Sequence, residues 1–269
     1  MAAAHFVRPK KHLGQHFLKD ASVAQRVAGS LTGHGGYKLV VEVGPGTGAL
    51  SKFLIGHPQF RWVGVDVDRD AIAFLRTAHP GLTNQILEAD FLRLDVTRHF
   101  GDEPFAVAGN FPYNISSQIL FKVLELRYRV PEMVGMFQKE VAQRIATGPG
   151  SKTYGILSVL TQAFFDVELL FQVSEHVFDP PPKVKSAVIR LQRKAVFHLD
   201  CDEKLFFAVV KTAFNQRRKT LRNALRPMNV NWDLLPLELP GLRAERLGVD
   251  EFVNITRSLK PTGDNQGPA

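Results

Sequence analysis

The chain has 269 residues and a mass of 30.0 kDa, enough to bury one large hydrophobic core or two smaller ones. Hydrophobic residues make up 45% and charged residues 22%, which excludes collagen-like, disordered and disulfide-stapled classes. The sequence lacks an apolar run of roughly 18 residues for a membrane span, a signal-like segment near its start and any Cys/His spacing for zinc. Its single cysteine, Cys201, excludes an internal disulfide. We expect a metal-free cytoplasmic protein.

Positive charge is concentrated in two short segments. Lys and Arg total 34 against 26 Asp and Glu, a net charge of +8. Six basic residues and no acid lie between positions 211 and 226, namely Lys211, Arg217, Arg218, Lys219, Arg222 and Arg226. Three more, Arg8, Lys10 and Lys11, lie near the start, and the rest of the chain carries a net charge of −1. This concentration favours an anionic partner such as nucleic acid, with a solvated charged face as the alternative.

In chain order, short β-rich runs alternate with helical stretches between about residues 39 and 140. This pattern is typical of an α/β domain with a largely parallel sheet. The expected strands are residues 39–43, 62–66, 85–89, 105–109 and 134–138. The expected helices are residues 48–55, 70–78, 116–127 and 139–146.

The remainder of the chain predicts a second, helical domain. After a Gly/Pro/Ser loop at 147–152, we expect a helix at 154–165 and two apolar runs, 167–173 and 186–191, joined by an extended triple-proline connection. The segments expected after these are a linker at 194–202, helical stretches at 203–225, 232–235, 243–247 and 249–259, and a frayed tail at 261–269. We therefore expect two domains, residues 1–193 and residues 194–269.

A glycine loop follows the first expected strand directly and precedes a helix. In Gly44-Pro-Gly-Thr-Gly48, glycines such as Gly46 let the backbone turn sharply and a ligand approach closely. Asp66 lies 22 residues after Gly44 at the next strand end, the spacing at which an acid meets ribose hydroxyls. Asp90 ends the third strand and could accept from an adenine amino group. The arrangement resembles class I S-adenosylmethionine methyltransferases rather than nicotinamide enzymes; glycines serving only a tight turn are the alternative.

The fourth strand is followed by Asn110-Phe-Pro-Tyr113. Asn110 offers a side-chain acceptor at a strand's carboxyl end, and Pro112 forces Phe111 into an extended conformation that can aim its carbonyl outward. Tyr113 supplies a flat face for stacking a base, worth roughly 1–3 kcal/mol. Two acceptors beside an aromatic plane suit the amine of an adenine extruded from its stack. The alternative is a turn with an asparagine cap and a core tyrosine.

Six motifs, in order over nearly the whole chain, resemble the small-subunit ribosomal RNA adenine dimethyltransferase family (the KsgA group). They are Lys11-His-Leu-Gly-Gln-His-Phe-Leu18, Val41-Glu-Val-Gly-Pro-Gly-Thr-Gly48, Asp66-Val-Asp-Arg-Asp70, Asn110-Phe-Pro-Tyr-Asn-Ile-Ser116, Val177-Phe-Asp-Pro-Pro-Pro-Lys-Val-Lys-Ser186 and Ala213-Phe-Asn-Gln-Arg-Arg-Lys-Thr-Leu-Arg222. The resemblance implies a Rossmann-like methyltransferase domain with a small C-terminal helical domain, and S-adenosylmethionine as cofactor. It also implies N6 dimethylation of two adjacent adenosines near the 3′ end of small-subunit rRNA, within an immature ribosomal subunit. We expect the protein to act as a monomer in ribosome biogenesis.

The same resemblance places the site residues. Cofactor contacts fall on His16, Leu18, Gly44, Gly46, Asp66, Asp90 and Asn110, and catalysis on Asn110, Phe111, Pro112 and Tyr113. The family often has Asn where His16 stands and Glu where Asp66 stands. Asp66 keeps the carboxylate with a shorter reach, whereas His16 introduces a titratable group.

The basic segment predicts an RNA-facing surface. On one continuous helix, Lys211, Arg218, Lys219, Arg222 and Arg226 would fall within an arc of roughly 100°. We expect RNA contacts from Lys10, Lys11, Lys211, Arg218, Lys219 and Arg222. Arg217 projects toward the apolar side, where it could pair with a buried acid. Phe178 either stacks on the second face of the flipped base or is a core aromatic.

Three other functions remain open at this point. They are a non-catalytic RNA-binding assembly factor, an adenine methyltransferase acting on large-subunit rRNA, and a nicotinamide oxidoreductase.

Overall fold

The computed structural model describes residues 7–260, so the tail expected at 261–269 lies outside the described residues. Its contacts divide the chain into two compact units. The first combines Met1–Ala146 with Phe165–Ala195, and the second combines Thr147–Phe164 with Val196–Ala269. The division after residue 195 lies close to the expected boundary. The structure differs from the expectation in one place, because residues 147–164 contact the C-terminal helices and belong to the second unit.

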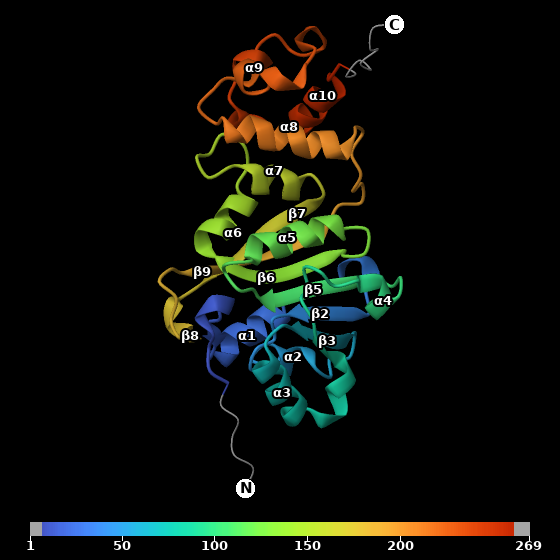
Figure 1. Ribbon diagram of the computed structural model, residues 1–269, viewed down its shortest axis with the longest axis vertical. Helices are drawn as coiled ribbons and strands as arrows, with labels where there is room; N and C mark the ends of the chain where they lie inside the picture. The colour runs from blue at the N-terminus through green and yellow to red at the C-terminus, as the bar shows by residue number, and fades with distance from the viewer. Residues whose placement is uncertain (1–6, 261–269) are drawn as a thin grey trace, which may run out of the picture. The chain divides into compact units, whose positions relative to one another are not determined.

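The first unit is built on a seven-stranded sheet with the order β4-β3-β2-β5-β6-β9-β7 (Figure 1). Its strands are β2 Leu39–Val43, β3 Arg61–Asp66, β4 Ile86–Glu88, β5 Phe105–Asn110, β6 Glu132–Gln138, β7 Phe165–Val173 and β9 Ser186–Arg193. The pairs from β4 to β6 are parallel, whereas β9 runs antiparallel to both of its neighbours. A separate two-stranded sheet pairs β1 Phe17–Leu18 with β8 Phe178–Asp179. The α/β class and the expected strand positions are confirmed.

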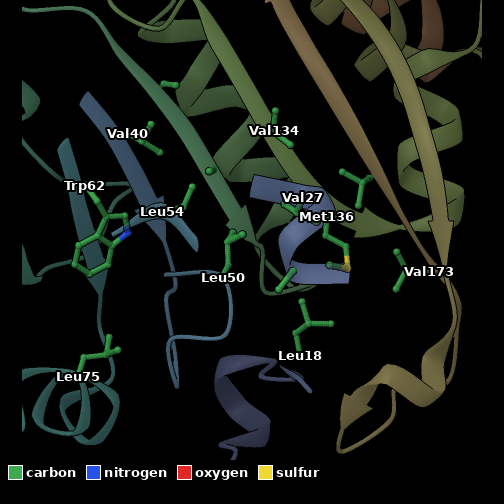
Figure 2. Packing of buried hydrophobic residues seen from close by; sticks show 14 of the residues in the cluster. Leu18, Val27, Val40, Leu50, Leu54, Trp62, Leu75, Val134, Met136 and Val173 are labelled. Carbon is green, nitrogen blue, oxygen red and sulfur yellow. The ribbon is translucent and has the colours of Figure 1, made fainter. Parts of the chain in front are cut away.

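The central strands are buried on both faces, which explains their mostly apolar sequences. All five residues of β2 are buried, and alternate residues point to opposite faces of the sheet. One face contributes Val40, Trp62, Val134 and Met136 to a core with side chains from the N-terminal helices (Figure 2). Leu18 packs into the same core, so the N-terminal segment is anchored against the sheet.

The helices of the first unit connect these strands. They are α1 Ala21–Ala28, α2 Ser51–Leu54, α3 Arg69–Ala78, α4 Val96–Phe100, α5 Ser116–Glu125 and α6 Lys139–Ala146. The side chains of Asp20, Asp68 and Asp95 accept hydrogen bonds from main-chain N–H groups at the starts of α1, α3 and α4. Helix α2 is shorter than the expected 48–55, because the glycine turn continues through Gly48, whose φ is 81°.

The second unit is helical, as expected. Its helices are α7 Ile156–Gln162, α8 Glu203–Asn215, α9 Leu221–Ala224 and α10 Val249–Arg257, with short 3₁₀ turns between them. The continuous helix predicted over 203–225 is wrong, because α8 ends at Asn215 and Thr220 is extended. The Leu221 N–H bonds to the Leu242 carbonyl 2.7 Å away, a tertiary contact that local periodicity does not reveal. No helix within the described range 7–260 has the length and hydropathy to cross a membrane.

Candidate active site

A cavity of about 240 Å³ opens at the carboxyl ends of the parallel strands. This is the edge where open α/β sheets place their ligands. Its lining comprises residues 13–18, 42, 44–47, 49–50, 66–67, 90, 92 and 110–115. Every residue predicted to contact the cofactor, and all four predicted catalytic residues, lie on it. The structure therefore brings together positions that are separated by up to about 100 residues in the sequence.

The backbone conformation of the loop after β2 requires glycine at three positions. Gly44, Gly46 and Gly48 have φ values of 71°, 55° and 81°, which side chains other than glycine rarely adopt. A Cβ at Gly46 would also lie 3.0 Å from the ring of Phe17. The loop can thus pass close to both a ligand and the N-terminal segment.

Asp66 ends β3 with its carboxylate held in one orientation. It is buried, and its two oxygens accept main-chain hydrogen bonds from Gly46 (3.1 Å) and Asp68 (2.9 Å). Burial is the largest influence and raises the pKa of Asp66, while the main-chain hydrogen bonds oppose it. A fixed carboxylate beside a glycine loop suits ribose hydroxyl donors.

Asp90 is more exposed than Asp66. Its Oδ1 accepts from the main-chain N–H of Leu92 at 2.9 Å, and its Oδ2 lies 3.7 Å from the guanidinium of Arg93. The side chain therefore caps the loop that follows β4 and borders the cavity.

Asn110 is positioned by the N-terminal segment. Its Nδ2 donates to the main-chain carbonyl of His16 at 2.9 Å. With the amide nitrogen engaged there, the side-chain oxygen is the atom that can accept a hydrogen bond from a ligand.

Phe111 anchors the turn that follows. Its ring is buried, packs edge-on against Phe137 with centroids 5.3 Å apart, and lies over Gly109 and Gly135. Phe111 also lies on the cavity, and its main-chain carbonyl is the only hydrogen-bond acceptor that this residue can offer there. Gly135 is a positioning residue that sequence reasoning missed, since nothing in its neighbourhood along the chain marks it.

Tyr113 and His16 form the aromatic side of the cavity. Their ring centroids are 5.4 Å apart, and the Tyr113 hydroxyl bonds to Ser186 Oγ at 2.5 Å. Burial raises the pKa of Tyr113, and the bond to Ser186 opposes the shift, so the phenol is neutral at physiological pH. The Pro180 carbonyl can only accept, so His16 Nδ1 donates to it at 2.7 Å. Ser186 and Pro180 belong to the motif at residues 177–186, and the sequence alone assigned neither of them a role.

The alternative assignments for Phe178 are resolved by its burial. The side chain is 0% exposed, belongs to the hydrophobic core of the sheet, and pairs with Leu18 across β1 and β8. Stacking of Phe178 on a base is therefore wrong, and the core assignment is confirmed.

Lys10 has a different environment from the one expected. Its ammonium lies 2.5 Å from Asp68 and 2.8 Å from Asp70, and these bonds raise its pKa. Lys11 is exposed, as the expected RNA contact requires.

The predicted RNA-binding residues of the second unit are all exposed, but they lie on α8, on the turn that follows it, and on α9. They are Lys211, Arg218, Lys219 and Arg222, with Arg226 exposed beyond them. Arg217 instead contacts the largely buried Glu245 at 3.8 Å and donates to the Ser151 carbonyl at 3.3 Å, which confirms its expected pairing.

The fold and site together define a class I S-adenosylmethionine methyltransferase. A parallel sheet carries a glycine loop after β2 and carboxylates after β3 and β4, all on one cavity. Within residues 7–260, no group of three or more His, Cys, Asp or Glu side chains is gathered as metal ligands would be.

Comparisons with known proteins identify the family. The family model described as ribosomal RNA adenine dimethylase matches residues 7–253. "Ribosomal RNA small subunit methyltransferase A" of Cytophaga hutchinsonii is 54% identical over 253 residues, covering 94% of this chain and 98% of that protein. Its counterpart in Flavobacterium johnsoniae is 51% identical, with 96% and 98% covered. The chain belongs to the ribosomal RNA adenine dimethylase family.

Solved structures share the fold. A dimethyladenosine transferase from Plasmodium falciparum superposes with a TM-score of 0.72 at 24% identity, covering 89% of this chain and 96% of the other. The 23S rRNA methyltransferase ErmE gives a TM-score of 0.68 at 25% identity, covering 90% and 99%.

The predicted fold, enzyme class and cofactor are therefore confirmed. The chain is an S-adenosylmethionine-dependent rRNA adenine dimethyltransferase. The nicotinamide oxidoreductase and the non-catalytic assembly factor are excluded as its primary function.

Proposed function

We propose that the protein dimethylates N6 of two adjacent adenosines near the 3′ end of small-subunit rRNA. Support comes from relatives named for the small subunit, which are 46–54% identical over at least 92% of their lengths, whereas the large-subunit enzyme ErmE is 25% identical. We further propose that it acts as a metal-free monomer in the cytoplasm on an immature ribosomal subunit.

The cofactor site is proposed on the cavity side of β2, β3 and β4. Asp66 accepts from ribose hydroxyls, Asp90 accepts from the adenine amino group, and Gly44 and Gly46 leave room for the ligand. His16 and Leu18 close the cavity from the N-terminal segment. When bound, S-adenosylmethionine supplies an electrophilic methyl group attached to a sulfonium.

Asn110 and Phe111 orient the target amine. The single observation that carries this mechanism is the bond from Asn110 Nδ2 to the His16 carbonyl, which fixes the orientation of the amide and therefore the direction in which its oxygen accepts. In the first transfer this oxygen and the Phe111 carbonyl accept hydrogen bonds from the two N6–H groups and draw the nitrogen toward a tetrahedral geometry, with its lone pair directed at the methyl group. In the second transfer one N6–H remains, so one of the two acceptors holds it. Pro112 keeps Phe111 extended. After the methyl group has been transferred, the N6 proton is acidic enough to leave to water, so no strong base is needed and positioning supplies most of the rate gain.

Tyr113 holds the extruded base by stacking. Its hydroxyl bond to Ser186 and the neighbouring His16 ring restrict the motion of the Tyr113 ring. A ring held in advance loses less conformational entropy when the base binds.

The RNA is held outside the cavity by exposed cations. We propose phosphate contacts for Lys11, Lys211, Arg218, Lys219 and Arg222, all of which are exposed. These contacts make affinity depend on salt, with a slope that falls by about one for each phosphate contact removed.

The test is methylation of purified ribosomal subunits. Small subunits from a strain lacking this protein are incubated with enzyme and S-adenosylmethionine, and N6-dimethyladenosine is mapped by mass spectrometry. We expect two adjacent dimethylated adenosines in small-subunit rRNA and none in large subunits. Asn110→Ala should abolish modification while the protein remains folded. Modification confined to large-subunit rRNA would overturn the proposal and favour the alternative substrate.

A further inference from the structure

A buried carboxylate outside the predicted site ties the N-terminal segment to the cofactor cavity. The Asp68 side chain is fully buried, and each of its oxygens is engaged. Oδ1 accepts from Lys10 Nζ at 2.5 Å and from the main-chain N–H of Asp70 at 3.0 Å. Oδ2 accepts from Gln15 Nε2 at 2.8 Å. Burial by itself would raise the pKa of Asp68, but the bonds from Lys10 and Gln15 lower it, so the group is ionised.

The same turn carries the acid assigned to the ribose. The main-chain N–H of Asp68 donates to Asp66 Oδ1, and the Asp68 side chain starts helix α3. A displacement of Asp68 would therefore move the support of Asp66. The two carboxylates have separate tasks, since Asp66 lines the cavity and Asp68 faces Lys10 and Gln15.

The segment held by Asp68 forms one wall of the cavity. Residues 13–18 line it, and the His16 carbonyl within this stretch orients Asn110. At the end of this stretch Leu18 pairs with β8, and the N–H of the next residue, Lys19, bonds to the Val177 carbonyl at 2.8 Å. The wall is therefore attached at both ends, by Asp68 before the cavity and by the short β1–β8 pair after it.

We propose that Lys10, Gln15 and Asp68 form a latch that holds residues 13–18 in place at the cofactor site. Lys10 then supports cofactor binding and does not contact RNA. Without the latch, the segment is still held by the β1–β8 pair and by the His16 bonds to Asn110 and Pro180, but residues 13–15 lose their fixed places on the cavity. These residues must then become ordered when the cofactor binds, and the conformational entropy lost in that ordering weakens binding. Lys10 and Asp68 are positioning residues, because neither lines the cavity.

The test measures cofactor binding directly, so it does not depend on which rRNA is methylated. The dissociation constant of S-adenosylmethionine is determined by calorimetry for the wild type, Lys10→Met, Asp68→Asn and the double variant. We expect each single substitution to weaken binding about tenfold, and the double variant to be no weaker than the weaker single one, since both break the same latch. Lys10→Arg should restore most of the affinity.

Lys11→Met is the matched control, because Lys11 is the exposed neighbour on the same segment. It should leave cofactor affinity within about twofold of the wild type while weakening RNA binding. Hydrogen exchange of amides 13–18 in the cofactor-free protein should accelerate in Lys10→Met and stay unchanged in Lys11→Met.

Two outcomes would overturn the latch. One is unchanged cofactor affinity and exchange in Lys10→Met. The other is a loss of RNA binding equal to that of Lys11→Met with no effect on the cofactor. If Asp68→Asn fails to fold, Lys10→Met and its Arg rescue still decide the question, because Lys10 is partly exposed.

Discussion

Replacing Gly135 by alanine tests how the catalytic turn is held. Gly135 lies in β6 between β5 and β9, so its main chain is fixed on both sides. An added Cβ would lie 2.0 Å from Cε2 of Phe111, more than 1 Å inside an ordinary carbon–carbon contact of about 3.5 Å. Since Phe137 packs against the same ring, the ring has to move together with its turn.

The displacement predicts a large loss of turnover with a moderate loss of stability. Overpacking of this kind costs about 1–3 kcal/mol of unfolding free energy. A shift of about 1 Å in the Asn110–Phe111 acceptors should lower kcat about 100-fold. The assay is single-turnover methylation of small subunits at saturating cofactor, together with urea unfolding.

Two variants make this result specific. Gly81→Ala is the control, because no atom lies within 4 Å of an added Cβ there, and it should leave kcat unchanged. Combining Gly135→Ala with Phe111→Leu removes the clashing ring carbons and should recover stability. Wild-type turnover and stability in Gly135→Ala would refute the reasoning.

Substitutions at three further positions test other parts of the structure. Tyr113→Phe should lower turnover only a few-fold, whereas Tyr113→Ala loses the stacking energy of roughly 1–3 kcal/mol with cofactor affinity unchanged, as calorimetry and turnover would show. Phe178→Leu should cost about 1–3 kcal/mol in urea unfolding, because it leaves a cavity in the core, and keep full turnover. Burial raises the pKa of Glu42 to about 7, against hydrogen bonds from Ser51 and Trp62. A folded-state pKa above the unfolded value of 4.5 makes the folded protein lose stability as pH rises through that interval. The stability gained by Glu42→Gln should therefore grow by about 2–3 kcal/mol between pH 5 and pH 8, and a pH-independent difference would contradict this.

The sequence pattern correctly predicted those parts of the fold in which the conformation favoured by neighbouring residues is also the one that tertiary packing requires. The strands that begin at Leu39 and Phe105 are mostly apolar, with Glu42 as the charged exception, and the glycines of the loop indicate a turn that other residues rarely adopt. The carboxyl-edge residues Asp66 and Asn110 then follow from the topology, since parallel strands end at one edge. The family motifs supplied His16 and Leu18, which no periodicity indicates.

The errors arose where tertiary contacts override local preference. The sequence from Glu203 to Leu225 has a helical pattern throughout, yet the bond from Leu221 to Leu242 starts a new helix instead. Lys10 reads as a mobile cation until Asp68, 58 residues away, is placed beside it. Charge along the chain indicated an anionic partner but could not separate the cations that face solvent from those that hold the protein together.

The two glycines beside Phe111 show why the catalytic turn needs support from a neighbouring strand. Two acceptors can hold one amine only if the main chain between them is rigid, and Pro112 restricts only the backbone of Phe111. The Phe111 ring supplies the second restraint, but it fits the sheet only where Gly109 and Gly135 leave the space of two side chains. The ring then anchors Phe111 next to Asn110 on the cavity lining. Correct orientation of the adenine N6 lone pair therefore depends on Gly109 and Gly135, although neither residue has a side chain that could contact the substrate.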